Sequence, residues 1–263
     1  MLLLRLTLVF YFLAALSAFV AVLGRPRWWR YLVPSLIGAG CATHIGALSS
    51  RALELGHCPL HTTGEVVSFL SLAGMLIYLL GFYGRGWQTL SVVLLPLSLV
   101  LAVVSNLLPA QALLVSAPGL ERLLMTLHIG VSTLGVAALF LTLGASLLYL
   151  WQEWALKHKS GATVLRLSLP SLETCDSIVY RSLVLGFMLM TLGILTVAMA
   201  QAMSPSNSMF LWNRRETFAL LAWAIFAVLL TGRLLAGWRG RKAAYLVIVG
   251  VAAVLLRMVG LSP

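Results

Sequence analysis

The chain of 263 residues carries 18 Lys and Arg against 7 Asp and Glu, which gives a formal net charge of +11. Hydrophobic residues make up 61% of the chain, charged residues only 10%, and the mean hydropathy is +1.01. Soluble domains are far less apolar, so this composition excludes an ordinary water-soluble globule and indicates an integral membrane protein. The basic residues stand in short gaps between apolar runs, where they set membrane orientation, and this argues against nucleic-acid binding.

Eight apolar runs of membrane-spanning length follow one another along the chain. Crossing a hydrocarbon core of about 30 Å takes roughly 20 helical residues, and the runs lack the alternation typical of barrel strands. The sequence therefore predicts an all-α polytopic membrane protein with eight transmembrane helices in one domain, 1–263. The first run is interpreted as a retained helix rather than a signal peptide. The predicted spans are 2–23, 32–50, 66–84, 88–108, 123–151, 182–203, 217–236 and 243–261.

The charges between the spans predict the orientation of the chain. Cytoplasmic loops carry an excess of Lys and Arg, and the gaps with this excess are 24–31, 85–87, 152–181 and 237–242. The remaining gaps are expected on the outer side together with both termini; they are 51–65, 109–122 and 204–216. Within the longest basic gap, the stretch SLETCDSIVY is predicted to form a short amphipathic helix that leads into the sixth span.

Two histidines lie inside predicted spans and are the candidates for a cofactor site. An ionisable side chain in a span is costly and usually faces a partner or a cavity. His44 and His128 each lie roughly 10 Å below the outer end of their span at 1.5 Å per residue. Imidazoles at one depth on two helices are suited to hold a haem iron from opposite sides. Alternatively, each histidine hydrogen-bonds a carbonyl or a hydroxyl of a neighbouring helix and binds nothing.

Helical spacing predicts which faces of these two spans make contacts. A stripe of small residues on the second span is predicted to pack closely against another helix; its members are Gly38, Ala42 and Gly46. His44 is expected to point away from this stripe. On the fifth span, His128 shares a face with Ser132 and Gly135, which predicts a slightly polar and roomy interior surface.

The outer gap 51–65 contains the sequence HCPLH, with His57, Cys58 and His61 close together. Such residues suit a soft or borderline metal, but Pro59 interrupts a regular helix and no fourth ligand is evident. A loop that covers a cofactor pocket is therefore expected. Glu65 begins the third span, where a carboxylate stabilises the helix N-terminus.

Arg257 lies near the outer end of the last span, where it is expected either to snorkel to the interface or to pair with an anionic ligand such as a haem propionate. Catalytic signatures such as a nucleophile elbow, a phosphate loop or a zincin motif are missing. The three cysteines form no CxxC pair and imply neither a disulfide framework nor a structural zinc site. A non-catalytic role is favoured.

From about residue 40 onward the chain resembles the cytochrome c assembly family, haem-handling membrane proteins that include CcsA and ResC. The resemblance rests on RALELGHCPLHTTGEVVSFLSLAGMLIYLL, on LHIGVSTLGVAALFLTLGASLLYLWQEWALK and on LPSLETCDSIVYRSLVLGFMLMTLGILTVAMA. Its most specific pieces are LGFMLMTLG at 185–193 and the ET, W, GR and GWRGRKAA elements of the last 50 residues. The short form is most similar to the HemX and YpjD branch.

The resemblance implies a tryptophan-rich haem-binding segment before the seventh span, which here reads LWNRRET. Trp212 and Glu216 match the family pattern, and Asn213 stands where the family has an aspartate. The adjacent Arg214 and Arg215 are expected to contact an anion, either a lipid phosphate or a haem propionate.

The resemblance also implies a haem ligand at His128, which matches an outer-face histidine of the family. The helical histidine of the family falls at Thr231, and a second outer histidine is not matched. We infer from its depth that His44 takes the place of the missing ligand.

The sequence therefore predicts a haem-binding protein of the bacterial inner membrane that holds haem b in the outer half of the bundle by bis-histidine ligation. The expected partners are membrane lipid and either other cytochrome c assembly proteins or a haem-biosynthesis enzyme. One alternative is a membrane scaffold that regulates such an enzyme through the basic 152–181 loop. A small-solute transporter is disfavoured, because paired intramembrane charges and interrupted helices are not evident.

Overall fold

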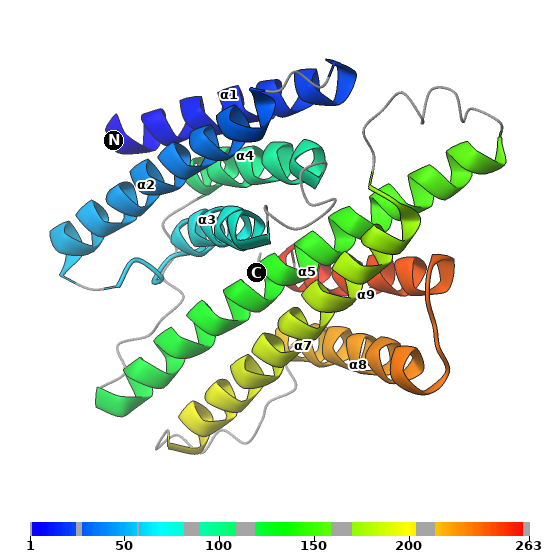
Figure 1. The fold of residues 1–263 in the computed structure, drawn as a ribbon. Helices are drawn as coiled ribbons and strands as arrows, with labels where there is room; N and C mark the ends of the chain where they lie inside the picture. Colours follow the sequence, from blue (N-terminus) through cyan, green and yellow to red (C-terminus); the bar gives the residue numbers. More distant parts are fainter. Residues whose placement is uncertain are drawn as a thin grey trace. The chain divides into compact units, whose positions relative to one another are not determined.

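The computed structural model describes residues 2–24, 28–56, 58–81, 90–108, 119–158, 170–203 and 214–259. Within these ranges the chain folds into eight α-helices, and the predicted all-α class is confirmed there (Figure 1). The helices are α1 (Leu2–Gly24), α2 (Trp29–Leu55), α3 (Thr63–Gly81), α4 (Ser91–Leu107), α5 (Gly119–Lys157), α7 (Leu172–Met203), α8 (Arg214–Leu235) and α9 (Arg241–Val259).

Six of the described helices contain segments that are long and apolar enough to cross a membrane. These segments are Leu2–Ala21, Tyr31–Leu55, Thr63–Gly81, Gly119–Lys157, Leu172–Met203 and Thr217–Leu235. Helix α4 is apolar but has only 17 residues. The protein is therefore a multi-pass helical membrane protein, while the number of eight spans stays a prediction.

Helices α5 and α7 are longer than the sequence predicted. Helix α5 has 39 residues and is about 58 Å long at 1.5 Å per residue, well beyond the hydrocarbon thickness of about 30 Å. The stretch SLETCDSIVY is helical from Leu172 onward, as predicted, but it is the first part of α7 and not a short helix of its own, because α7 runs unbroken from Leu172 to Met203. The Ser171 hydroxyl caps its first turn by accepting from the Thr174 N–H at 3.1 Å, and no proline interrupts the helix after it.

The chain divides into two compact units, each of which is described by itself. Unit 1 comprises Met1–Val115 and Gln152–Thr174, and unit 2 comprises Ser116–Trp151 and Cys175–Pro263. Unit 1 therefore contains α1 to α4, and unit 2 contains most of α5 and α7 together with α8 and α9.

In unit 1, α1 packs against α2 and α4, and α3 packs against α2 and α4 (Figure 1). Helices α1 and α2 pack tightly at Gly40, where an added Cβ would lie 2.5 Å from the Tyr11 ring. The small-residue stripe predicted at Gly38, Ala42 and Gly46 is confirmed only at Gly46, where an added Cβ would lie 3.4 Å from the Leu3 side chain of α1. Gly38 has open space where a Cβ would stand, and Ala42 is exposed. The contact row is instead the one that contains Gly40 and the buried His44, because the bulky Tyr11 ring needs the glycine.

In unit 2, α5 packs on α7 through glycines. A Cβ on Gly135 would lie 3.2 Å from the Gly186 carbonyl oxygen, and Thr142 donates to the Ser182 hydroxyl at 2.9 Å. Helix α8 lies along another face of α7, where the Trp223 indole donates to Thr191 at 3.0 Å and stacks on the Phe187 ring. Helix α7 therefore packs against α5 on one face and against α8 on another.

Candidate functional site

His128 of α5 is held by the backbone of α7. Its Nδ1 lies 2.7 Å from the Gly193 carbonyl oxygen, and the Ser132 hydroxyl lies 3.4 Å from the same nitrogen. A carbonyl oxygen only accepts hydrogen bonds, so Nδ1 carries the proton and Nε2 of the neutral ring carries the lone pair. Metal-ligating histidines are oriented in this way, with the second ring nitrogen donating to a carbonyl or a carboxylate. The residue therefore has the orientation of a metal-ligating histidine.

The face of α5 that carries His128 is tightly packed, which corrects the prediction of a roomy interior surface. A Cβ on Gly193 of α7 would run into the Ser132 hydroxyl, and one on Gly135 would lie 3.1 Å from the Met190 nitrogen. Ser132 and Gly135 thus let α5 and α7 approach closely. His128 itself is half-buried beside this contact.

His44 of α2 lies in a hydrogen-bonded row that joins three helices of unit 1. The ring is fully buried, with Nε2 at 2.8 Å from the Ser68 hydroxyl on α3 and Nδ1 at 3.4 Å from the Tyr11 hydroxyl on α1. The Tyr11 hydroxyl in turn lies 3.7 Å from the Cys41 sulfur. Both partners of His44 are hydroxyls, which donate or accept, so the contacts do not fix the tautomer.

Both histidines therefore have the neighbours that the alternative interpretation predicted, a hydroxyl for His44 and a carbonyl for His128. His44 belongs to unit 1 and His128 to unit 2. Their joint ligation of one iron stays a prediction.

The loop between α2 and α3 is held in place by Glu65. The Glu65 carboxylate is buried and accepts from the Arg51 Nε at 2.9 Å, from the His61 N–H at 2.9 Å and from the Thr62 N–H at 3.1 Å. The Thr62 hydroxyl accepts from the Glu65 N–H, which completes a capping box at the start of α3. Among the residues whose positions are described, no group of three His, Cys, Asp or Glu could hold a metal ion.

Cys58 in the same loop is exposed. Partial burial of the thiol and, to a smaller degree, the nearby Glu65 carboxylate raise the pKa of Cys58 above its ordinary value. The thiol is therefore protonated and weakly reactive at neutral pH.

Several predicted site residues lie outside the described part of the structure. Trp212 and the rest of the stretch 204–213 fall there, as do His57 and residues 159–169 of the basic gap 152–181. The backbones of α8 and α9 include three further candidates whose side chains are not described; they are Arg214, Arg215 and Arg257.

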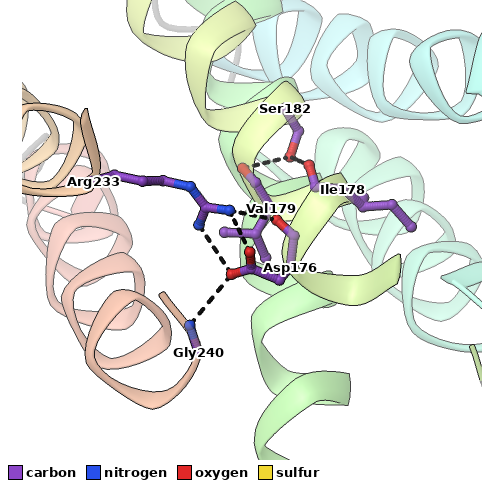
Figure 2. Close-up of polar contacts among 6 residues, drawn as sticks. All are labelled: Asp176, Ile178, Val179, Ser182, Arg233 and Gly240. Atoms are coloured by element: carbon purple, nitrogen blue, oxygen red, sulfur yellow. Dashed lines mark hydrogen bonds and ion pairs between the residues drawn. The ribbon is translucent and has the colours of Figure 1, made fainter. Parts of the chain in front are cut away.

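A buried ion pair in unit 2 was missed by the sequence reasoning. Figure 2 shows Asp176 of α7 bound by both Arg233 Nη atoms, at 3.0 and 2.5 Å, and by the Gly240 N–H at 3.3 Å. Arg233 also donates to the Asp176 carbonyl oxygen and lies 5.0 Å from the centre of the Tyr180 ring. An arginine inside the apolar run of α8 was the available signal, since such a charge needs a partner.

The fold and these contacts define a multi-pass helical membrane protein with a buried histidine on α2 and a half-buried histidine on α5. The family model of the Cytochrome C assembly proteins matches residues 63–262, which is most of the chain. The chain therefore belongs to the cytochrome c assembly protein family, as the sequence analysis predicted.

Curated relatives of the chain are cytochrome c biogenesis proteins CcsA. The protein of Synechococcus sp. (strain RCC307) is 28% identical over 276 residues, covering 95% of this chain and 88% of the relative. That of Parasynechococcus marenigrum (strain WH8102) is 29% identical with the same coverage, and that of Guillardia theta is 27% identical over 84% of this chain and 79% of the relative. The family match contains His128 and Ser68 but begins after α2, so His44 and Tyr11 precede it.

Proposed function

We propose that this chain is a haem-handling membrane protein of cytochrome c assembly that binds haem b in its outer half. The observation that carries this proposal is the 2.7 Å contact from His128 Nδ1 to the Gly193 carbonyl oxygen. It leaves Nε2 as the nitrogen with the lone pair, and neutral imidazole is the form that ligates iron. The names of the CcsA relatives and the family point to the same process.

His128 is the first axial ligand in this proposal, and it also matches a ligand position of the family in sequence. The Gly193 carbonyl fixes the tautomer and the direction of the ring, which raises the basicity of Nε2. Haem, when bound, would supply an iron that protein nitrogens ligate.

His44 is the second axial ligand in this proposal. To bind iron, His44 Nε2 must lose its hydrogen bond to the Ser68 hydroxyl, while the Tyr11 hydroxyl remains a partner for Nδ1. Because a hydroxyl hydrogen bond contributes only about 1 kcal/mol net, a ligand bond to iron outweighs it. Ser68 is thus a competitor for the nitrogen that would bind iron.

The propionates are proposed to meet the cations at the outer end of unit 2, with Trp212 as a platform for the macrocycle. The cations are Arg214, Arg215 and Arg257. This assignment depends on the proposed topology, which has eight spans in one domain and both termini on the outer side of a bacterial inner membrane. The short form of the chain favours the HemX and YpjD branch.

Cytochrome c maturation in cells that lack the chain tests the proposed process. We expect haem-stained cytochrome c to fall in the deletion strain and to return with the wild-type gene. His128→Ala should fail to restore the stain, and His158→Ala, at an exposed position at the end of α5, should restore it. Normal cytochrome c in the deletion strain would refute the proposal.

A further inference from the structure

The connection between α8 and α9 is a short turn that follows a candidate membrane segment. The candidate membrane segment of α8 ends at Leu235, and α9 begins at Arg241. We call residues 236–242 the basic turn, because its cations Arg239, Arg241 and Lys242 are all exposed.

Two glycines give the basic turn its shape. Gly237 and Gly240 have φ angles of 63° and 64°, a region that other residues rarely adopt. After Gly237 the chain folds back, so that the Trp238 N–H donates to the Gly232 carbonyl oxygen at 3.1 Å and the Trp238 ring covers Gly232. A Cβ on Gly240 would lie 2.6 Å from the Tyr149 hydroxyl of α5.

The basic turn is anchored to the body of unit 2 by Asp176. Its carboxylate accepts from the Gly240 N–H and from the Arg233 guanidinium, as Figure 2 shows. Arg233 is only 7% and Asp176 only 18% exposed, so this anchor is largely shielded from solvent. Because Arg233 neutralises Asp176, this carboxylate does not offset the exposed cations of the turn.

Exposed apolar side chains end α8 just before the basic turn. Leu234 and Leu235, the last residues of α8, are 63% and 84% exposed. Cations at the end of a membrane segment meet lipid head groups, and exposed leucines one turn away meet acyl chains. This order of charges and apolar groups is complementary to an anionic phospholipid.

We propose that the basic turn is a binding site for the phosphodiester head group of an anionic phospholipid. Arg239 and Lys242 bind the phosphate, and Leu234 and Leu235 contact the acyl chains. The Asp176–Arg233 pair and the two glycines hold the cations in place before the lipid arrives, which lowers the entropic cost of binding. The site is independent of the histidines and of haem.

Lipid titration of the purified full chain in detergent tests this site. The probe is phosphatidylglycerol, with phosphatidylcholine as the neutral lipid, and bound lipid is counted by native mass spectrometry. The double substitution Arg239→Gln and Lys242→Gln should lower the affinity for phosphatidylglycerol about tenfold or more, because each cation near a membrane surface contributes to the binding of anionic lipid. Arg5→Gln with Lys157→Gln removes the same charge from exposed positions of unit 1 and should leave the affinity within about twofold.

A variant that leaves the charge of the protein unchanged tests the role of the shape of the basic turn. Gly240→Ala keeps every cation but forces a methyl group against Tyr149 at a positive φ, so it should also weaken phosphatidylglycerol binding. Equal losses in the two double variants would overturn the site in favour of net charge alone. Wild-type affinity in Gly240→Ala would overturn the inference that the shape of the turn holds the cations in place. Inorganic phosphate that competes as well as the lipid would overturn the assignment to a phospholipid.

Discussion

His44 and His128 differ in the hydrogen-bonding roles of their partners. The Gly193 carbonyl accepts only, whereas the Ser68 and Tyr11 hydroxyls act as donors or acceptors. His128 is therefore held in the tautomer that suits ligation, and His44 is held in a network that competes with it. At the scale of single residues, this difference predicts that loss of the Ser68 hydroxyl favours ligation by His44.

Ser68→Ala should strengthen haem binding. Removal of the hydroxyl leaves His44 Nε2 without its 2.8 Å partner, so iron no longer competes with a hydrogen bond of about 1 kcal/mol. We expect the apparent dissociation constant for haem, measured by absorbance titration, to fall about fivefold. Ser71→Ala is the matched control, because Ser71 is equally buried on α3 but donates to the Ser98 carbonyl. Unchanged affinity in Ser68→Ala would exclude His44 as a ligand.

Cys58 should react slowly with maleimides at neutral pH. Burial and the Glu65 carboxylate raise the pKa of the thiol, and only the thiolate reacts. The labelling rate should therefore keep rising with pH beyond the ordinary pKa of a cysteine. Glu65→Gln removes the carboxylate charge while preserving the capping-box pattern, so it should lower the pKa and speed labelling. Equal rates in the two proteins would show that Glu65 does not act on the thiol. Cys41 and Cys175 are buried and serve as internal controls.

At the scale of helices, the sequence predicted where the helices are but not which rows of side chains make contact. Spacing alone placed the contact stripe of α2 at Gly38 and Ala42, although the row at Gly40 has the same period. The choice depends on Tyr11, a residue 29 positions earlier in the chain, whose ring fits only against a glycine. Similarly, the ion pair of Asp176 with Arg233 joins positions that no local pattern connects.

Gly40→Ala and Gly38→Ala test this assignment of the contact row. At Gly40 the new methyl group meets the Tyr11 ring, and such overpacking costs typically 1–3 kcal/mol. At Gly38 it meets nothing within 4 Å, and alanine favours a helix over glycine. Thermal unfolding in detergent should therefore show a lower Tm for Gly40→Ala and an equal or higher Tm for Gly38→Ala. A lower Tm for Gly38→Ala than for Gly40→Ala would support the stripe predicted from spacing instead.

At the scale of the whole molecule, composition and apolar runs were sufficient to predict a helical membrane protein. The lengths of α5 and α7 were not predictable from hydropathy, because their polar ends continue the helix beyond the apolar run. The family was recognisable from motifs in α7, α8 and α9, and the family match over residues 63–262 confirmed it. The hydrogen-bond partners of the two histidines could not be predicted, since they come from other helices.

The absorption spectrum of the purified full chain after haem addition tests the central claim most directly. We predict a Soret band that is lost or strongly reduced in His128→Ala and is retained in His158→Ala, since His158 is exposed at the end of α5. In the wild-type protein, the visible bands should be those of six-coordinate, low-spin haem with two nitrogen ligands. A Soret band of full intensity and unchanged position in His128→Ala would contradict the account.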